Sequence, residues 1–218
     1  VAKSSRTATA SPRADLADFL LGILLLATAP LWGLWILSRP HLRAHLIERL
    51  RRVQAGPFDV WVHGASVGEI LALETLLARL KIKKPEARVL LTVNTPAGRA
   101  AAKAKYPHCA VQLAPLDWGP VLRRFLRGLN LKLHLLSELD IWPERQRELA
   151  RQGIPTLVAG ARMSATGFRR TRRAWLLMGP AYKNVQHWAC RDEATRERLI
   201  SLGMDPAKVA VSGSLKFD

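Results

Sequence analysis

From residue 58 onward, short apolar runs alternate with longer helical patterns. The runs are apolar at successive positions, which is typical of strands that helices cover on both faces of a parallel sheet. The alternation therefore predicts a doubly wound α/β domain. Its predicted strands are residues 58–62, 88–93, 109–113, 131–136, 154–159, 185–190 and 208–212, and its predicted helices are residues 67–80, 97–104, 118–128, 143–152, 171–182 and 192–202. No G-x-G-x-x-G is present, so dinucleotide binding has no direct support.

The first predicted strand ends in a small-residue turn, and a helix begins near Val67. Free N–H groups at a helix start suit an anion, but this helix carries its own carboxylate, Glu69, in its first turn. A carboxylate beside the carboxyl end of a strand, facing a cleft, is placed to act as a general base. The alternative interpretation is that Glu69 only complements the helix dipole.

Candidate ligand-binding residues follow each of the first five predicted strands. Because ligands bind beyond the carboxyl ends of parallel strands, these positions predict one site at one edge of the sheet. They are Ser66, Gly68, Glu69, Asn94, Thr95, Pro96, Pro115, Asp117, Glu138, Asp140, Arg162 and Ser164.

Several of these residues also have structural interpretations. Asp117 fits the N-cap of the helix predicted at 118–128, and Asp140 fits the start of the next helix, where Pro143 is favoured in the first turn. Glu138 directly follows an apolar strand, where a structural acid needs a partner. Arg162 is a candidate for that partner, or for holding a substrate phosphate.

Residues 19–38 contain no charged side chain. At about 1.5 Å per residue, a helix of this length reaches roughly 30 Å, the thickness of a bilayer core. Arginines are dense directly after it, which predicts a membrane anchor with the globular part on the cytoplasmic side. A cleaved signal peptide and a helix that lies in one leaflet are the alternatives. Residues 1–18 are predicted to be disordered, and residues 39–57 to form a basic linker.

The chain holds 34 Lys and Arg against 17 Asp and Glu, a formal net charge of +17, which implies an anionic partner. No nucleic-acid-binding motif is visible, and the membrane segment favours anionic lipid or a phosphorylated substrate over nucleic acid. Residues 162–173 contain five arginines, which indicate either a lipid-binding site or a solvated face. Cys109 and Cys190 form neither a metal-binding spacing nor a disulfide framework.

Five segments, in order along the chain, resemble the Kdo transferases, which attach 3-deoxy-D-manno-octulosonic acid (Kdo) to lipid A precursors. Ser66-Val67-Gly68-Glu69, after an apolar strand and a histidine, resembles the signature of that family. The other four segments are Thr92-Val93-Asn94-Thr95-Pro96-Ala97-Gly98, Ser137-Glu138-Leu139-Asp140-Ile141-Trp142-Pro143, Gly160-Ala161-Arg162-Met163-Ser164 and Gly213-Ser214-Leu215-Lys216-Phe217-Asp218.

The resemblance implies a glycosyltransferase of the GT-B architecture, with two Rossmann-like halves. Residues 58–218 would be the acceptor-binding N-terminal half and would end at the interdomain linker, with the C-terminal half missing or on a separate chain. The donor would be CMP-Kdo, the acceptor a lipid A precursor, and the place the cytoplasmic face of the bacterial inner membrane. Glu69 would be the general base and Glu138 a supporting acid. The implied substrate-binding residues are Ser66, Gly68, Thr95, Glu138, Arg162 and Ser164, with no metal or cofactor.

The sequence departs from the family pattern at three positions. Asp140 stands where the family usually has Glu, Glu144 where it has Asn, and Gly160 where it has Asn. These changes lie in the implied acceptor site. They leave open an alternative function, a catalytically inactive module that binds anionic lipid or docks to a partner.

Overall fold

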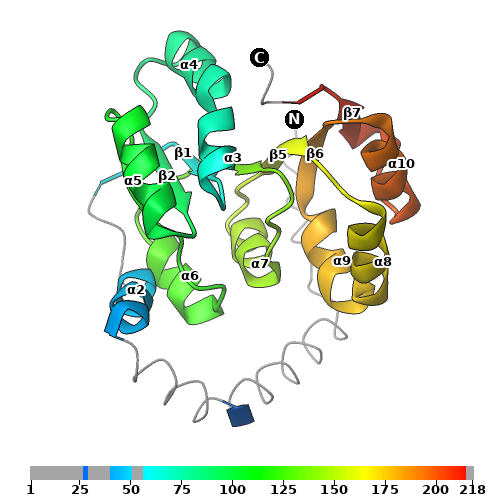
Figure 1. Cartoon of the computed structure of the whole chain (residues 1–218), viewed down its shortest axis with the longest axis horizontal. Helices are drawn as coiled ribbons and strands as arrows, with labels where there is room; N and C mark the ends of the chain where they lie inside the picture. The colour runs from blue at the N-terminus through cyan, green and yellow to red at the C-terminus, as the bar shows by residue number, and fades with distance from the viewer. Residues whose placement is uncertain (1–26, 29–39, 51–55, 215–218) are drawn as a thin grey trace, which may run out of the picture. The chain divides into compact units, whose positions relative to one another are not determined.

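The computed structural model describes residues 27–28, 40–50 and 56–214. Within them, seven strands form one sheet in the order β3-β2-β1-β4-β5-β6-β7, and every neighbouring pair is parallel (Figure 1). The strands are β1 (Val60–His63), β2 (Val89–Val93), β3 (Ala110–Leu113), β4 (Leu133–Ser137), β5 (Thr156–Ala161), β6 (Val185–Cys190) and β7 (Val209–Val211). The predicted doubly wound α/β domain is thus confirmed, with each strand near its predicted place.

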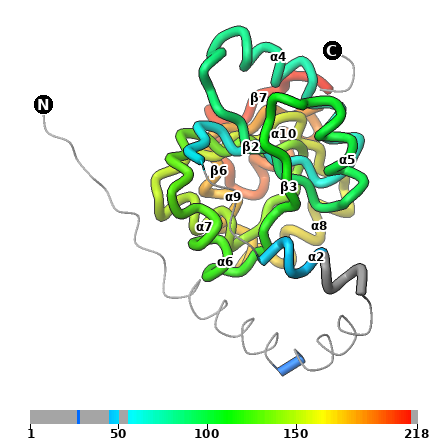
Figure 2. Tube along the Cα trace, turned by 90° about the vertical axis from the view of Figure 1, so that its left-hand side faces the viewer, coloured from blue at the N-terminus to red at the C-terminus, as the bar shows by residue number. Residues whose placement is uncertain are grey.

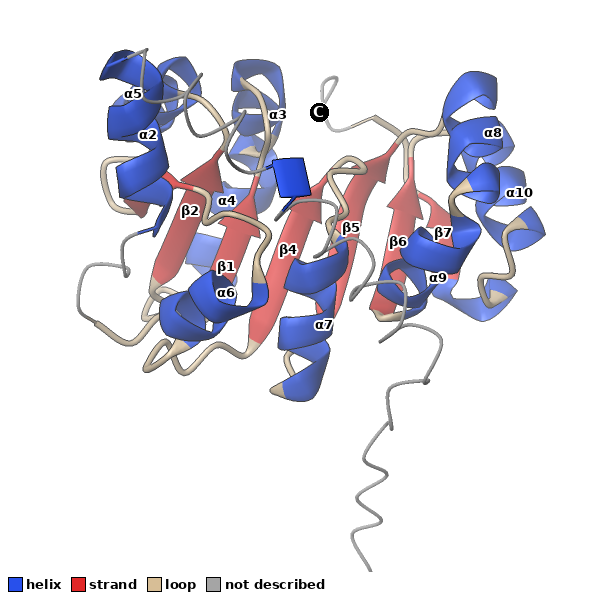
Figure 3. Cartoon of the chain, turned by 90° about the horizontal axis from the view of Figure 1, so that it is seen from below, coloured by secondary structure: helices blue, strands red, loops and turns tan. Residues whose placement is uncertain are grey.

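Helices cover both faces of the sheet (Figure 3). On one face, the strand residues Val62 and Leu91 pack with Ile70 and Leu77 of the helices that follow β1. On the other, Trp61 of β1 packs against the helices that follow β3 and β4. The described helices are α2 (Pro40–Leu50), α3 (Val67–Ala72), α4 (Glu74–Lys83), α5 (Pro96–Lys105), α6 (Gly119–Leu126), α7 (Pro143–Arg151), α8 (Ala165–Arg173), α9 (Trp175–Lys183), α10 (Glu193–Ser201) and the short 3₁₀ helix η1 (Pro206–Lys208).

Two predicted helices differ from the observed ones. The helix predicted at 67–80 is two helices, because Leu73 turns its N–H back to the carbonyl of Ile70, three residues earlier, and ends α3 there. The helix predicted at 171–182 is also two, α8 and α9, which meet at Ala174. Helix α8 begins earlier than predicted because the hydroxyl of Ser164 caps its first turn.

Part of the predicted basic linker is helical, since α2 occupies residues 40–50. The end of α2 is bonded to the segment before α6, where Arg49 Nε donates to the carbonyl of Ala114 at 2.9 Å and Leu116 N–H donates to the carbonyl of Arg49 at 3.4 Å (Figure 2). Of the predicted anchor at 19–38, only residues 27 and 28 are described. No helix among the described residues is long and apolar enough to cross a membrane.

The strand order reverses direction between β1 and β4, which are direct neighbours although two strands separate them in the sequence. In a doubly wound sheet, the crevice for a ligand opens at this switch point, beyond the carboxyl ends of the strands. The segments that follow β1 and β4 carry Glu69 and Glu138. The fold therefore brings the two main predicted residues to the place where such a sheet binds ligands.

Candidate active site

The turn after β1 presents Glu69 at the start of α3. Ser66 is the N-cap, and its Oγ accepts a hydrogen bond from the N–H of Glu69 at 3.3 Å. The Glu69 carboxylate reaches back in turn, accepting from the Ala65 N–H at 2.9 Å and from the Ser66 hydroxyl at 3.0 Å. This arrangement is a variant of the capping box, which stabilises a helix start. Gly64 lies close to this helix, because a Cβ atom there would lie 2.8 Å from Ile70 Cδ1, so a larger residue would require the Ile70 side chain to shift.

The surroundings of Glu69 also favour a chemical role. Burial raises its pKa, and the charges of Glu138 and Asp140 raise it further, while the hydrogen bonds from Ala65 and Ser66 oppose the shift. A carboxylate with a raised pKa is a stronger base than an ordinary one. The same contacts hold it in one orientation. The structural interpretation of Glu69 and the catalytic one are therefore compatible.

Glu138 directly follows β4 in a left-handed conformation with φ 57°, which is uncommon for a residue other than glycine. Its N–H donates to the carbonyl of Ala159 at 2.9 Å, which ties the turn to the neighbouring strand β5. Strained backbone of this kind is often found at functional sites. The charge of Glu138 is one of the smaller causes of the raised pKa of Glu69.

Asp140 accepts hydrogen bonds from three side chains. The donors are His63 Nε2 at 2.7 Å, Asn94 Nδ2 at 3.2 Å and Trp142 Nε1 at 2.8 Å. The guanidinium of Arg145 lies 3.7 Å away. Burial by itself would raise the pKa of Asp140, but the hydrogen bonds from His63 and Trp142 and the charge of Arg145 hold that pKa well below its usual range.

Asp117, and not Asp140, caps the helix that follows β4. Its carboxylate oxygens accept from the N–H groups of Glu144 and Arg145, at 3.0 and 2.7 Å. The prediction that Asp117 caps the helix at 118–128 was wrong, since the N-cap of α6 is Trp118, without a side-chain hydrogen bond. Asp117 holds the start of α7 from a distant part of the chain.

The remaining predicted site residues also lie beyond strand ends. Thr95 and Ser164 are N-caps of α5 and α8, and each hydroxyl oxygen accepts an N–H from the first turn of its helix. Arg162 is exposed directly after β5. Gly68 is exposed in α3, and a Cβ atom there would meet no other atom within 4 Å. That side of α3 is open to a ligand that approaches the backbone.

Sequence reasoning missed the buried polar residues behind this edge. His63 and Thr92 are fully buried, and Arg145 is 3% exposed with its guanidinium carbon 5.8 Å from the centre of the Trp61 ring. Burial and the charge of Arg145 lower the pKa of His63 to about 4, so its contact with Asp140 joins a neutral imidazole to a carboxylate. The only sign of these buried polar residues in the sequence was a histidine at the end of an otherwise apolar predicted strand.

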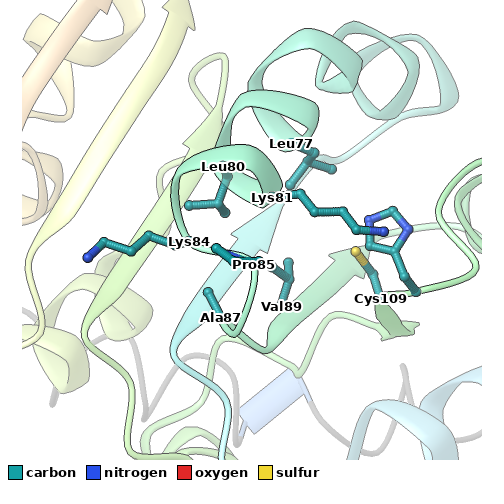
Figure 4. Close-up of a pocket in the computed structure, with 9 residues that line it drawn as sticks. Leu77, Leu80, Lys81, Lys84, Pro85, Ala87, Val89 and Cys109 are labelled. Atoms are coloured by element: carbon teal, nitrogen blue, oxygen red, sulfur yellow. The ribbon is translucent and has the colours of Figure 1, made fainter.

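One pocket lies away from these residues, at the amino ends of the strands near the start of β2 (Figure 4). Its lining includes Lys81, Lys84, His108 and Cys109, and none of the predicted site residues. Burial raises the pKa of the Cys109 thiol to about 11, so it is protonated at neutral pH. Among the described residues, no group of three or more His, Cys, Asp or Glu is arranged to hold a metal ion.

The fold defines the class of protein first. The chain superposes on a UDP-GlcNAc 2-epimerase from Neisseria meningitidis bound to UDP-GlcNAc, with a TM-score of 0.54 and 12% identity over 72% of this chain and 46% of that one. Another UDP-N-acetylglucosamine 2-epimerase gives a TM-score of 0.56 and 11% identity over 74% and 49%. At this identity the similarity shows the fold alone, a Rossmann-like parallel α/β domain.

The sequence then defines the family. The family model for 3-deoxy-D-manno-octulosonic-acid transferase (kdotransferase) matches residues 42–218, and the chain belongs to that family. It is 28% identical to the 3-deoxy-D-manno-octulosonic acid transferase of Haemophilus influenzae over 191 residues. The matched region covers 85% of this chain and 45% of that protein. It is 32% identical over 163 residues to the transferase of that name from Chlamydia pneumoniae, covering 74% and 37%. The chain spans less than half the length of these relatives.

The structure gives a physical reason why one departure from the family pattern is tolerated. Gly160 has φ +67° and lies beside a register irregularity between β5 and β6. Glycine and asparagine are the two residues that adopt this left-handed conformation most readily. Glycine in place of asparagine at this position therefore keeps the backbone of β5.

Proposed function

We propose that this chain is the acceptor-binding half of an inverting glycosyltransferase that transfers Kdo from CMP-Kdo to a lipid A precursor, with Glu69 as the general base. Membership of the family supports the reaction class. The single observation that carries the assignment of the base is the position of Glu69. It is an oriented carboxylate with a raised pKa, beyond the end of β1 at the switch point of the sheet, where the neighbouring strand β4 leads into Glu138.

In the proposed reaction, Glu69 accepts the proton of an acceptor hydroxyl as its oxygen attacks the anomeric carbon of Kdo. The bond from that carbon to the phosphate oxygen of CMP breaks, and CMP leaves with both bonding electrons. The N–H of Ala65 and the hydroxyl of Ser66 keep the carboxylate in place before and after the transfer. Glu138 supports the acceptor from the neighbouring segment, and the other proposed substrate-binding residues are Ser66, Gly68, Thr95, Arg162 and Ser164.

The second part of the proposal is that the domain works at the cytoplasmic face of the bacterial inner membrane, against anionic lipid. Four arginines of α8, Arg169, Arg170, Arg172 and Arg173, are exposed, and the ion pairs found among the described residues include none of them. Leu176 and Leu177 of α9 follow them and are 66% and 40% exposed. Exposed cations next to exposed leucines suit an anionic lipid surface.

A transfer assay in detergent tests the reaction. The full chain is supplied with CMP-Kdo and a lipid A precursor, alone and joined to the C-terminal half of a family member. We expect product from the joined protein, and at least about a thousandfold less from its Glu69→Gln variant, because general-base catalysis and orientation at this site are lost together. Asp192→Asn, which changes a carboxylate at the start of α10, is the control and keeps full activity.

Full activity in Glu69→Gln would remove Glu69 as the base. Lipid binding without transfer by the joined protein would indicate the inactive module instead.

A further inference from the structure

Four parts of the chain meet at the carboxylate of Asp140. His63 Nε2 donates from the end of β1 at 2.7 Å, and Asn94 Nδ2 donates from beyond β2 at 3.2 Å, both to Oδ2. Trp142 Nε1 donates to Oδ1 at 2.8 Å, and Arg145 of α7 faces Oδ2 at 3.7 Å. A carboxylate is the one side chain that accepts from this many donors at two oxygen atoms.

The protons in the hydrogen bonds behind Asp140 can be assigned from chemistry. The Trp61 indole N–H is only a donor, so Thr92 Oγ1, 2.8 Å away, accepts from it. The Thr92 hydroxyl proton is then directed to His63 Nδ1 at 2.9 Å, a shorter distance than the 3.5 Å to the carbonyl of Val62. His63 therefore carries its proton on Nε2 and donates it to Asp140. Trp61, His63 and Thr92 are fully buried, which fixes this chain of donors.

Asp140 belongs to the short segment between β4 and α7 that begins with Glu138. Glu138 has φ 57°, a conformation that persists only where surrounding contacts impose it. The N–H of Glu138 donates to the carbonyl of Ala159 in β5, and within the segment the N–H of Ile141 donates to the carbonyl of Leu139. The carboxylate of Asp140 is the point where β1, β2 and α7 all bind this segment.

We propose that Asp140 is a positioning residue: held by His63, it fixes the segment between β4 and α7 and with it the place of Glu138 at the switch point of the sheet. The inference rests on the proposed function, in which Glu69 and Glu138 share the acceptor site. It assigns the task of orientation to a pair made of the fully buried His63 and the partly buried Asp140.

Asp140→Asn tests the proposal, because the amide replaces one acceptor oxygen by a donor that faces His63, Asn94 or Trp142. We expect amide hydrogen exchange at Glu138 and Ile141 in the full chain to become about tenfold faster or more. Asp192→Asn is the matched control, since Asp192 caps α10 through the Thr195 N–H and lies outside this cluster. Exchange at Glu138 and Ile141 that is the same in both variants would overturn the proposal.

Trp142→Phe is a milder second variant that keeps the charge and the buried donors, and it decides the question if Asp140→Asn does not fold. It removes the donor to Oδ1 from a side chain that is 46% exposed. We expect about threefold faster exchange at the same two amides. Unchanged exchange in a folded Trp142→Phe protein, with Asp140→Asn unfolded, would count against the proposal.

The catalytic measurement separates this inference from the proposed function. In the joined enzyme, Asp140→Asn is expected to lower kcat about tenfold or more, with a change of less than about threefold in the KM for the acceptor, because orientation at the reacting atoms is lost. Transfer by the wild type with an unchanged kcat in the variant would overturn the positioning role alone. No transfer by the wild type would contradict the proposed function, and the exchange measurements would then decide on the positioning role.

Discussion

Glu69 combines two properties that the sequence presented as alternatives. It closes the start of α3 through Ala65 and Ser66, and the same contacts aim its carboxylate. Burial and two neighbouring carboxylates raise its pKa. The structural role at the helix start is compatible with the proposed role in proton transfer, because an oriented carboxylate loses less freedom when a substrate binds.

His63 predicts how the stability of this domain depends on pH. Burial lowers its pKa to about 4 in the folded state, against 6.5 for an ordinary histidine. The unfolded chain therefore binds this proton more readily, so the stabilisation is complete above about pH 6.5 and is lost as the pH falls toward about 4. The full difference corresponds to about 3 kcal/mol in the free energy of unfolding. Urea unfolding between about pH 7 and about pH 4.5 measures it.

His63→Gln isolates the contribution of this residue. The amide reproduces one donor and one acceptor without titrating, so the variant is expected to lose less stability on acidification than the wild type. Some dependence remains, because burial also holds the pKa of His134 well below its usual value. His187→Gln changes an exposed histidine and serves as the control. An equal pH dependence in wild type and His63→Gln would contradict the prediction.

Helix α7 depends on a residue that is distant in the sequence. Trp142 is its N-cap, but its side chain does not cap the helix N–H groups, so Asp117 accepts from the first of them instead. The same helix places Arg145 against Asp140. The Asp117 carboxylate therefore joins the loop before α6 to the start of α7, the helix that carries Arg145.

Removal of this cap is expected to destabilise the domain. Asp117→Ala leaves the N–H groups of Glu144 and Arg145 without their acceptor, which costs about 1–2 kcal/mol in the free energy of unfolding. Urea unfolding at neutral pH provides the measurement. Asp205→Ala, which removes an exposed cap of η1, is the control and should cost less than half as much. Equal losses in the two variants would show that Asp117 is no more important than a surface cap.

At the scale of the whole molecule, the proposed contact with anionic lipid depends on positive charge. The net charge is +17, and the arginines of α8 lie next to the exposed leucines of α9. Helix α8 contributes no fully buried residue, although Phe168 packs against the core, and its four arginines are exposed. An arginine near an anionic surface contributes about 1 kcal/mol to binding.

Lipid discs of different composition test this surface in the full chain. We expect amide exchange in α8 and α9 to slow in discs with anionic lipid but not in neutral ones. The double variant Arg169→Gln, Arg173→Gln should lose that protection, because two of the attracting charges are gone. The control double variant, Lys83→Gln with Lys84→Gln, removes the same charge from exposed positions near the amino ends of the strands. It should keep the protection from exchange. Protection that is independent of lipid charge would exclude an electrostatic contact.

The fold could be read from local patterns to a large extent. Seven apolar runs became seven strands, because burial on both faces favours nearly continuous apolar runs in the central strands β1, β2, β4 and β5. The positions of Glu69 and Glu138 directly beyond two apolar runs predicted from the sequence alone that both lie at one end of the sheet. The N-caps Ser66, Thr95 and Ser164 lie there for the same reason, since each strand end leads into a helix start.

The partners of the buried polar residues could not be read in this way. His63 meets Asp140 across 77 positions, and Asp117 meets the start of α7 across 27 and 28. Neither contact has a local pattern, because each depends on β1 lying between β2 and β4 in the sheet. Local hydrophobic periodicity thus established the strands and helices, and it placed the candidate site residues at the carboxyl ends of the strands. The packing of distant segments established which carboxylate is oriented, which one caps a helix, and which imidazole stays neutral.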